Sequence, residues 1–209
     1  MIDTALFGKL AGGISIAAYL PYIWAILKYR NDPEKRVTPN RASWTIWTIV
    51  SGIIWASYTS SGATDTAWVP AGYTIGSFIV SLLSIKFGEG GWAKLDRNCF
   101  VAAGIGLMLW WAFDSPLYTL FTSLSVDIVA SFPTIKKVWI NPKSEDKLAW
   151  LLFWGGSLAN VLAVNKWAFV IYVYPVAMFV LITLITGLIL WDKERPKLTP
   201  SPMRIVKAD

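Results

Sequence analysis

One ionisable side chain in the middle of an apolar stretch is the clearest chemical feature of this sequence. Asp127 lies near the centre of the apolar residues 116–138, six positions before Pro133. A carboxyl group at that depth in a bilayer costs about 2.5 to 3.5 kcal/mol. Ionisable groups held in such surroundings are typical of functional sites, so we predict that Asp127 binds a proton or a cation. The alternative is a neutral, hydrogen-bonded carboxylic acid that holds the helices together.

Hydroxyl side chains share one helical face with this acid. They recur at intervals of three or four residues, which is the spacing of one face of a helix. The members of this polar stripe are Thr119, Ser123, Asp127, Ser131 and Thr134. Polar groups avoid lipid, so we expect the stripe to line the interior of the protein.

Aromatic and hydroxyl side chains in other apolar segments could complete a site for a small polar molecule. Indole faces beside hydroxyl and amide groups suit a sugar ring, a nucleoside or a cation. The predicted substrate-binding residues are Asn160, Trp154, Ser157, Ser123, Ser131, Tyr73, Ser77, Ser51 and Trp55. Trp44 and Trp150 follow basic loops, and for these two we favour an ordinary aromatic belt at the membrane surface.

These residues lie on long apolar segments. The chain has 209 residues, is 55% hydrophobic and has a mean hydropathy of +0.50, which indicates a membrane protein without a soluble domain of any size. Segments of about 18 to 25 apolar residues are long enough to cross a bilayer as helices. We expect seven, over residues 4–28, 40–60, 67–86, 97–114, 116–138, 147–165 and 167–191. The first is expected to be a retained span and not a signal peptide.

Two parts of the chain repeat the same landmarks. In the first they are Pro21, Trp44 and Pro70, and in the second Pro133, Trp150 and Pro175. The second and third landmarks are 26 positions apart in the first part and 25 in the second. A duplicated three-helix unit explains this match.

The repeat predicts the fold class and the domain organisation. We expect an all-α membrane protein with seven transmembrane helices as 3+1+3, in which two parallel triple-helix repeats are joined by a connecting helix. Repeat 1 covers residues 4–86, the connecting helix 97–114 and repeat 2 residues 116–191. Residues 192–209 are then a cytoplasmic tail.

The prolines at matching positions of the two repeats suggest places where helices bend. A proline inside a helix removes one backbone hydrogen bond and crowds the preceding turn. We predict that Pro21 and Pro133 are hinges, with a static kink needed only for packing as the alternative.

The charge distribution predicts the topology. Seventeen of the nineteen Lys and Arg residues fall after the first, third, fifth and seventh segments. By the positive-inside rule the amino end lies outside and the carboxyl end in the cytoplasm. The net charge of +6 therefore reflects topology rather than binding to nucleic acid.

The residue inventory argues against an enzyme. The chain has no histidine and one cysteine, Cys99, and no carboxylate cluster has the spacing of a metal site. We expect no cofactor and no metal. A retinal protein is disfavoured because no lysine lies between Lys166 and Lys193, across the last segment.

The paired prolines in a seven-segment chain resemble the PQ-loop and SWEET (MtN3-like) transporter superfamily, over about residues 5–190. The prolines are followed by Tyr22 and Thr134, where the superfamily often has glutamine. The resemblance implies a membrane transporter that moves a small polar metabolite across the lipid bilayer by alternating access. Asp127 resembles the coupling aspartates of its proton-driven members.

Two other functions are compatible with this resemblance. One is a seven-helix ligand-binding receptor or sorting protein of the same fold, as in the KDEL receptor. The other is a passive sugar facilitator. SWEET transporters have an asparagine on the third helix of each repeat, and residues 67–86 and 167–191 contain none. A homo-oligomer and a monomer are both left open.

Overall fold

The computed structural model describes residues 4–60, 68–112, 116–164 and 168–191, and every regular element in them is a helix. The helices are α1 Thr4–Ala17, α2 Tyr19–Lys28, α3 Arg41–Ser60, α4 Trp68–Phe87, α5 Lys94–Ala112, α6 Pro116–Ile140, the short η1 Pro142–Ser144, α7 Lys147–Leu162 and α8 Phe169–Leu190. The all-α class is confirmed. The expected apolar segments coincide with these helices, and the tail over 192–209 lies outside the described residues.

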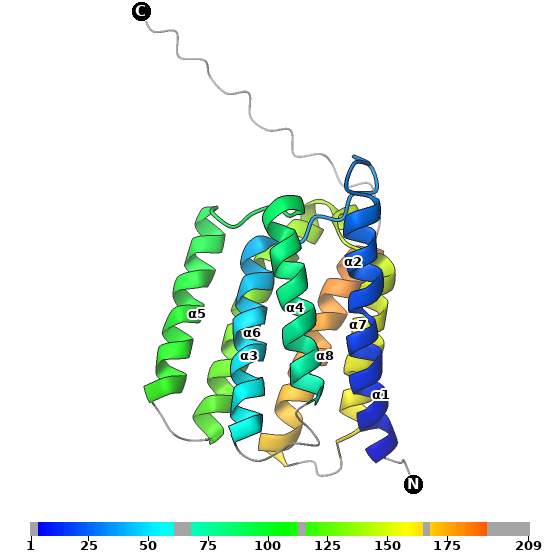
Figure 1. Cartoon of the computed structure of the whole chain (residues 1–209). Helices are drawn as coiled ribbons and strands as arrows, with labels where there is room; N and C mark the ends of the chain where they lie inside the picture. The colour runs from blue at the N-terminus through cyan, green and yellow to red at the C-terminus, as the bar shows by residue number, and fades with distance from the viewer. Residues whose placement is uncertain (1–3, 61–67, 113–115, 165–167, 192–209) are drawn as a thin grey trace, which may run out of the picture.

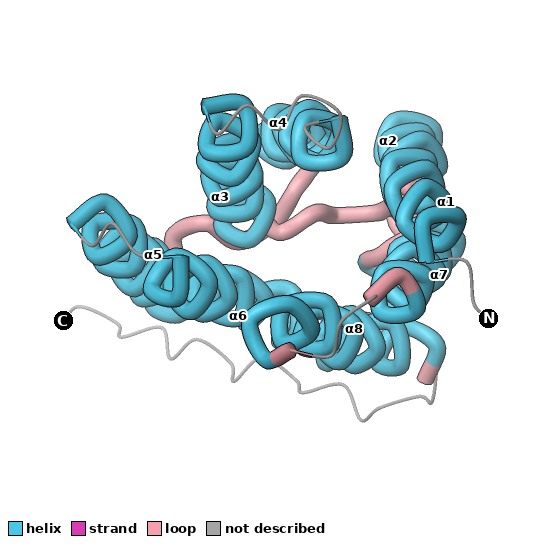
Figure 2. Tube along the Cα trace, turned by 90° about the horizontal axis from the view of Figure 1, so that it is seen from below, coloured by secondary structure: helices cyan, strands magenta, loops and turns pink. Residues whose placement is uncertain are grey.

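The helices form two groups with the same internal order (Figures 1 and 2). In the first group, α4 packs against α3 on one side and against α1 and α2 on the other. In the second group, α8 packs against α6 and α7. The third helix of each group therefore lies between the other two. Helix α5 lies outside both groups, against α6 and α3.

Contacts between the groups are also paired. The first helix of the first group, α1, packs against α7, which is the second helix of the second group. The first helix of the second group, α6, packs against α3, which is the second helix of the first group. These two contacts correspond to each other as in an interface with twofold symmetry.

The chain direction agrees between the groups. In Figure 1 the chain runs upward in α1, α2 and α4 and again in α6 and α8, and downward in α3, α5 and α7. The loops over residues 29–40, 88–93 and 141–146 consequently lie at the same end of the molecule. We call it the loop end.

The first helix is interrupted at Ala18, between α1 and α2. The cause lies three residues later, because Pro21 has no backbone N–H to donate to the carbonyl of Ala17 and its ring crowds that carbonyl. Ala18 itself keeps helical dihedral angles and its bond to the carbonyl of Ile14 at 3.0 Å. Pro133 differs, since it lies inside the continuous helix α6.

Small residues allow α1 and α7 to approach closely. A Cβ atom added at Gly156 would overlap the side chain of Ser15, so these two backbones are nearly in contact. An added Cβ at Gly8 would lie 4.0 Å from Ala163. Small residues that bring helices together are typical of membrane bundles.

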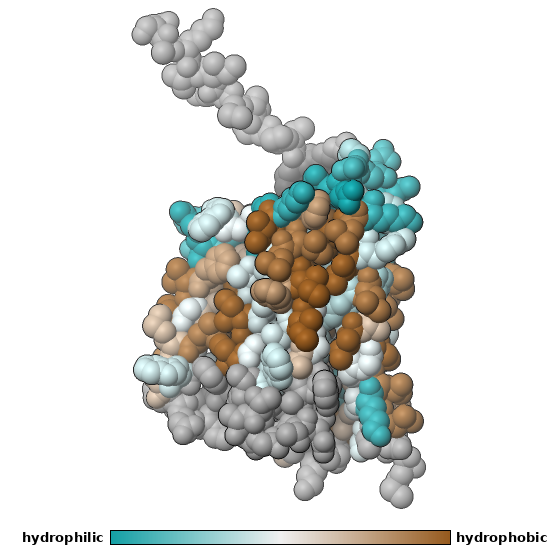
Figure 3. Space-filling model, viewed as in Figure 1, coloured by the Kyte–Doolittle hydropathy of each residue, from teal (hydrophilic) through white to brown (hydrophobic). Residues whose placement is uncertain are grey.

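The surface is apolar around the middle of the helices. Within the described part of the chain, two helical stretches, over Leu6–Lys28 and Tyr172–Leu190, are long and apolar enough to cross a membrane. Large apolar side chains are exposed on other helices as well, with Ile85 68% and Met108 66% exposed. Figure 3 shows this apolar surface below a polar cap at the loop end. An apolar surface of this extent supports a membrane protein.

Candidate functional site

Asp127 is buried between two helices of the second group. Its side chain on α6 is 5% exposed and its Oδ2 accepts a hydrogen bond of 2.6 Å from the Tyr174 hydroxyl on α8. The Ser131 hydroxyl, one turn later, donates to the backbone carbonyl of Asp127 at 2.8 Å. The acid is therefore held by a phenol, and its neighbour in the polar stripe is bonded to the helix itself.

Asp127 forms no ion pair among the described residues. The salt bridge that the described residues do contain joins Lys137 and Glu145. A buried carboxylate without a cationic partner is costly, whereas the protonated acid can share a hydrogen bond with a phenol. The contact is thus one that either protonation state of Asp127 can make.

The predicted substrate residues of the first group lie close together. The Ser51 hydroxyl on α3 is 3.3 Å from the Ser77 hydroxyl on α4. Ser77 also donates to the carbonyl of Tyr73 at 2.7 Å, and the Tyr73 ring packs edge-on against Tyr19 with centroids 6.2 Å apart. Ser51 and Ser77 therefore form a hydroxyl cluster between α3 and α4, and the Tyr73 ring lies next to it against Tyr19 on α2.

The predicted residues on α7 lie apart from this cluster. The Trp154 indole N–H donates to the Thr183 hydroxyl on α8 at 3.0 Å, and the Ser157 hydroxyl donates to the carbonyl of Trp154 at 2.8 Å. Asn160 is exposed. Helix α8 is the element that both Trp154 and Asp127 contact.

Two further candidates lie on α6 and α3. Ser123 lines a small hollow with residues of α3, α5 and α6, among them Val50, Gly106 and Val126. Trp55, near the end of α3, is 37% exposed. Ser123 therefore lies beside α5.

Trp44 and Trp150 do not form an aromatic belt. The two side chains are only 3% and 4% exposed and lie in the same buried cluster as Tyr19 and Tyr22. Our preference for a belt was wrong because a position at the start of a span gives the depth of a side chain and not the direction in which it points. Both indoles point inward.

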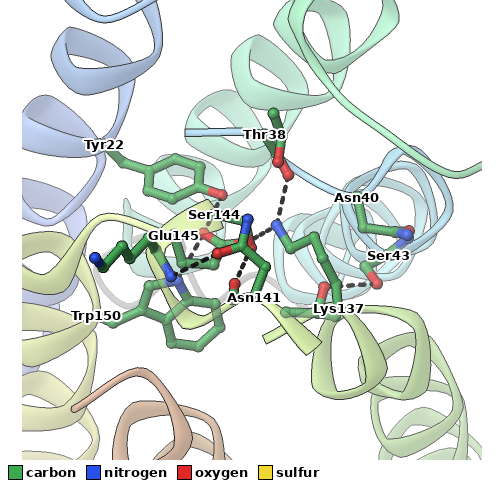
Figure 4. Close-up of polar contacts among 11 residues, drawn as sticks. Tyr22, Thr38, Asn40, Ser43, Lys137, Asn141, Ser144, Glu145 and Trp150 are labelled. Atoms are coloured by element: carbon green, nitrogen blue, oxygen red, sulfur yellow. Dashed lines mark hydrogen bonds and ion pairs between the residues drawn. The ribbon is translucent and has the colours of Figure 1, made fainter. Parts of the chain in front are cut away.

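A polar cluster at the loop end was missed by the sequence analysis (Figure 4). Glu145, in the loop before α7, accepts hydrogen bonds from the Tyr22 hydroxyl at 2.5 Å and from the Trp150 indole at 2.9 Å, and it forms the ion pair with Lys137. The Lys137 amino group also donates to the carbonyl of Thr38 at 2.5 Å. We call Tyr22, Lys137, Glu145 and Trp150 the loop-end cluster.

One signal in the sequence pointed to this cluster. Lys137 follows Thr134 by three residues, so it extends the polar stripe of Asp127 toward the loop end. The sequence analysis includes Lys137 only among the basic residues that predict the topology. Its buried partner, Glu145, lies in a loop and has no periodic signal at all.

The residues that follow the two prolines both bond across the groups. Tyr22 on α2 reaches Glu145 of the second group, and Thr134 on α6 donates to the Ser43 hydroxyl of the first group at 2.9 Å. Each bond joins a first helix to the start of the other group's second helix. The landmark repeat therefore corresponds to matching contacts.

The beginnings of α3 and α7 have matching N-caps as well. The Asn40 side chain accepts from the Ser43 backbone N–H at 3.0 Å, and the Asp146 side chain accepts from the Ala149 N–H at 2.7 Å. Each cap lies four residues before the tryptophan landmark of its part. Asn and Asp are among the residues preferred at this position.

No protein-family model, no curated protein and no solved structure matches this chain.

Proposed function

We propose that this protein is a membrane transporter that moves a small polar metabolite by alternating access and is coupled to a proton or a cation through Asp127. The observation that carries the proposal is the pairing of buried Asp127 with the Tyr174 hydroxyl. A carboxyl group that costs several kcal/mol in lipid and has a neutral partner is suited to gaining and losing a proton.

The architecture of the proposal has seven spans as 3+1+3. It is supported by the two helix groups of identical internal order, by their common chain direction and by α5, which links them in the chain and lies outside both. Parallel repeats of this kind place the substrate site at the interface of the two halves. The same features support the resemblance to the PQ-loop and SWEET superfamily.

The orientation of the proposal places the loop end in the cytoplasm and the amino end outside. The loops at that end and the helix turns that flank them, over residues 28–41, 86–97 and 136–147, contain twelve of the nineteen Lys and Arg residues of the chain. Figure 3 shows polar side chains concentrated there. Basic loops are retained on the cytoplasmic side during insertion.

Coupling follows from the position of Asp127 within one group. The acid joins α6 to α8, and α6 also packs against α3 of the other group. Gain or loss of its proton changes the α6–α8 contact and, through α6, the interface between the halves. A substrate bound near that interface then responds to the state of Asp127.

The test begins with the purified protein in detergent and a thermal-shift screen of amino acids, nucleosides and sugars. A ligand that binds only the folded state raises the melting temperature. The ligand is then offered to proteoliposomes with and without an inward proton gradient. Accumulation that follows the gradient supports the proposal. Binding without any flux indicates the receptor or sorting function, and flux that ignores the gradient indicates the passive facilitator.

A further inference from the structure

The loop-end cluster gathers one carboxylate and donors from three helices. Glu145 is bonded by Tyr22 from α2, by Lys137 from α6 and by Trp150 from α7. The side chain of Glu145 is fully buried, and that of Lys137 is 5% exposed. Each oxygen of the carboxylate has at least one donor, so the charge is fully compensated while the cluster is closed.

The cluster joins the two helix groups to each other. Tyr22 belongs to the first group, and Glu145, Lys137 and Trp150 belong to the second. Lys137 adds a bond to the carbonyl of Thr38, in the loop before α3. The Thr38 backbone N–H in turn donates to the carbonyl of Ser144 at 2.9 Å. Three helices and two loops are thus tied together at the loop end.

A charged cluster of this kind can be opened in a way that an apolar contact cannot. Two buried charges have lost their hydration, and that loss is recovered when water reaches them. Separation of Glu145 from Tyr22 would therefore be compensated by hydration of the carboxylate and of the Lys137 amino group. Separated apolar side chains would gain nothing from the same water.

The helix that bears Tyr22 has a place where it can bend. Tyr22 comes directly after Pro21, and the helix is interrupted at Ala18, one turn before Tyr22. A proline, which removes one helical hydrogen bond and crowds the preceding turn, is a place where a helix can bend. Helix α2 could thereby leave the cluster while α1 stays packed against α7.

We propose that Glu145 and Lys137, with Tyr22 and Trp150, form the latch that keeps the cytoplasmic end of the transporter closed in this conformation. This inference rests on the proposed function. Opening toward the cytoplasm requires the Tyr22 hydroxyl to leave Glu145. Tyr22, Lys137 and Glu145 are positioning residues in this scheme and need not touch the substrate.

The experiment measures access to a buried position and needs no substrate. In a Cys99→Ala background, a reporter cysteine replaces Ala25, which is 1% exposed and lies on α2 one turn after Tyr22. A second reporter protein has Ala11→Cys instead, on α1, where the side chain is 7% exposed. A polar maleimide is added to the purified full-length proteins in detergent, and the rate of thiol labelling is followed.

The test variant is Glu145→Gln and the matched control is Glu34→Gln, in the exposed part of the loop after α2. If the cluster acts as a latch, Glu145→Gln raises the labelling rate of the Ala25 reporter at least tenfold and leaves that of the Ala11 reporter unchanged. Tyr22→Phe, which removes one bond to Glu145, raises the Ala25 rate by a smaller factor. Glu34→Gln changes neither rate.

Two results would overturn the latch. An unchanged Ala25 rate in Glu145→Gln means that the cluster does not hold this end closed. An equal rise at Ala11 and Ala25 means that the substitution loosens the whole fold. Neither result bears on Asp127, because the labelling assay involves no transport, so failure of the latch and failure of the proposed function are separate outcomes.

Discussion

The Tyr22 hydroxyl donates to Glu145 Oε2 at 2.5 Å across 123 positions of the chain. The bond joins the residue after the first proline to the loop before α7. Its counterpart in the other half joins Thr134, the residue after the second proline, to Ser43 at the start of α3. The helices that contain Pro21 and Pro133 are therefore each held at the loop end by the opposite group, where a change in helix angle would alter the contact between the groups.

Asp127→Asn is expected to leave the protein folded and inserted but to abolish uptake driven by a proton gradient while sparing exchange of substrate. The amide keeps a hydrogen-bonding partner for Tyr174 but cannot gain or lose a proton. Uptake and exchange of the ligand identified by thermal shift are measured in proteoliposomes. Asp32→Asn, in the loop after α2, is the matched control. Equal gradient-driven uptake by Asp127→Asn and the parent would contradict the coupling role.

Pro21→Ala and Pro133→Ala are each expected to slow transport without weakening substrate binding. Alanine restores the missing N–H donor, so the helix loses the site at which it bends. For Pro21 the interruption at Ala18 should close, and helix content measured by circular dichroism should not fall. Transport rate and binding affinity are measured on the same preparations. Parent-like rates in both variants would show that the prolines are static kinks.

Gly156→Ala is expected to destabilise the protein by about 1–3 kcal/mol, because the added Cβ overlaps Ser15 on α1. Gly187→Ala on α8 is the control, since nothing lies within 4 Å of a Cβ added there. In that control the free energy of unfolding should rise by about 0.5–1 kcal/mol, because alanine loses less conformational freedom than glycine when the helix folds. Thermal unfolding in detergent ranks the variants. In the double variant, Ser15→Ala should recover part of the stability that Gly156→Ala removes. If the stability changes of the two substitutions simply add, the two residues are not in direct contact.

Asp146→Ala is expected to cost about 1 kcal/mol by removing the N-cap of α7. Asp146→Asn keeps an acceptor for the Ala149 N–H and should retain the cap. Burial raises the pKa of Asp146, so its charged form is less favourable in the folded protein than in the unfolded chain. Parent stability is then lost relative to Asp146→Asn as the pH rises through that pKa. Melting temperatures of both proteins at acidic and neutral pH test this direction. A parent whose melting temperature rises relative to that of Asp146→Asn as the pH rises would contradict it.

The helices were predictable because apolar length is a local property. Segments that must satisfy every backbone group in lipid form helices whatever their neighbours are, so the expected bounds and the observed bounds agree closely. Asn40 and Asp146 cap two of these helices in the structure, and neither cap was predicted. The interruption before Pro21 also has a local cause, although the uninterrupted helix around Pro133 shows that proline alone does not decide the outcome.

The partners of these residues were not predictable. Asp127 bonds Tyr174, which is 47 positions away, and the polar stripe around the acid gave no sign of a phenol on α8. Trp44 and Trp150 point inward although their place in the chain suits a membrane surface. Hydropathy and periodicity describe one helix at a time, whereas these contacts depend on how helices are rotated and which helices are neighbours.

The sequence by itself therefore determined the helical segments, the duplicated landmarks and the presence of one acid in an apolar span, since each of these follows from its pattern of residues along the chain. Only the tertiary structure decided that Tyr174 faces Asp127 and that Lys137 and Glu145 are buried together as a pair. The physical reason is that burial and charge compensation depend on the packing of several helices at once, and no single segment encodes that packing.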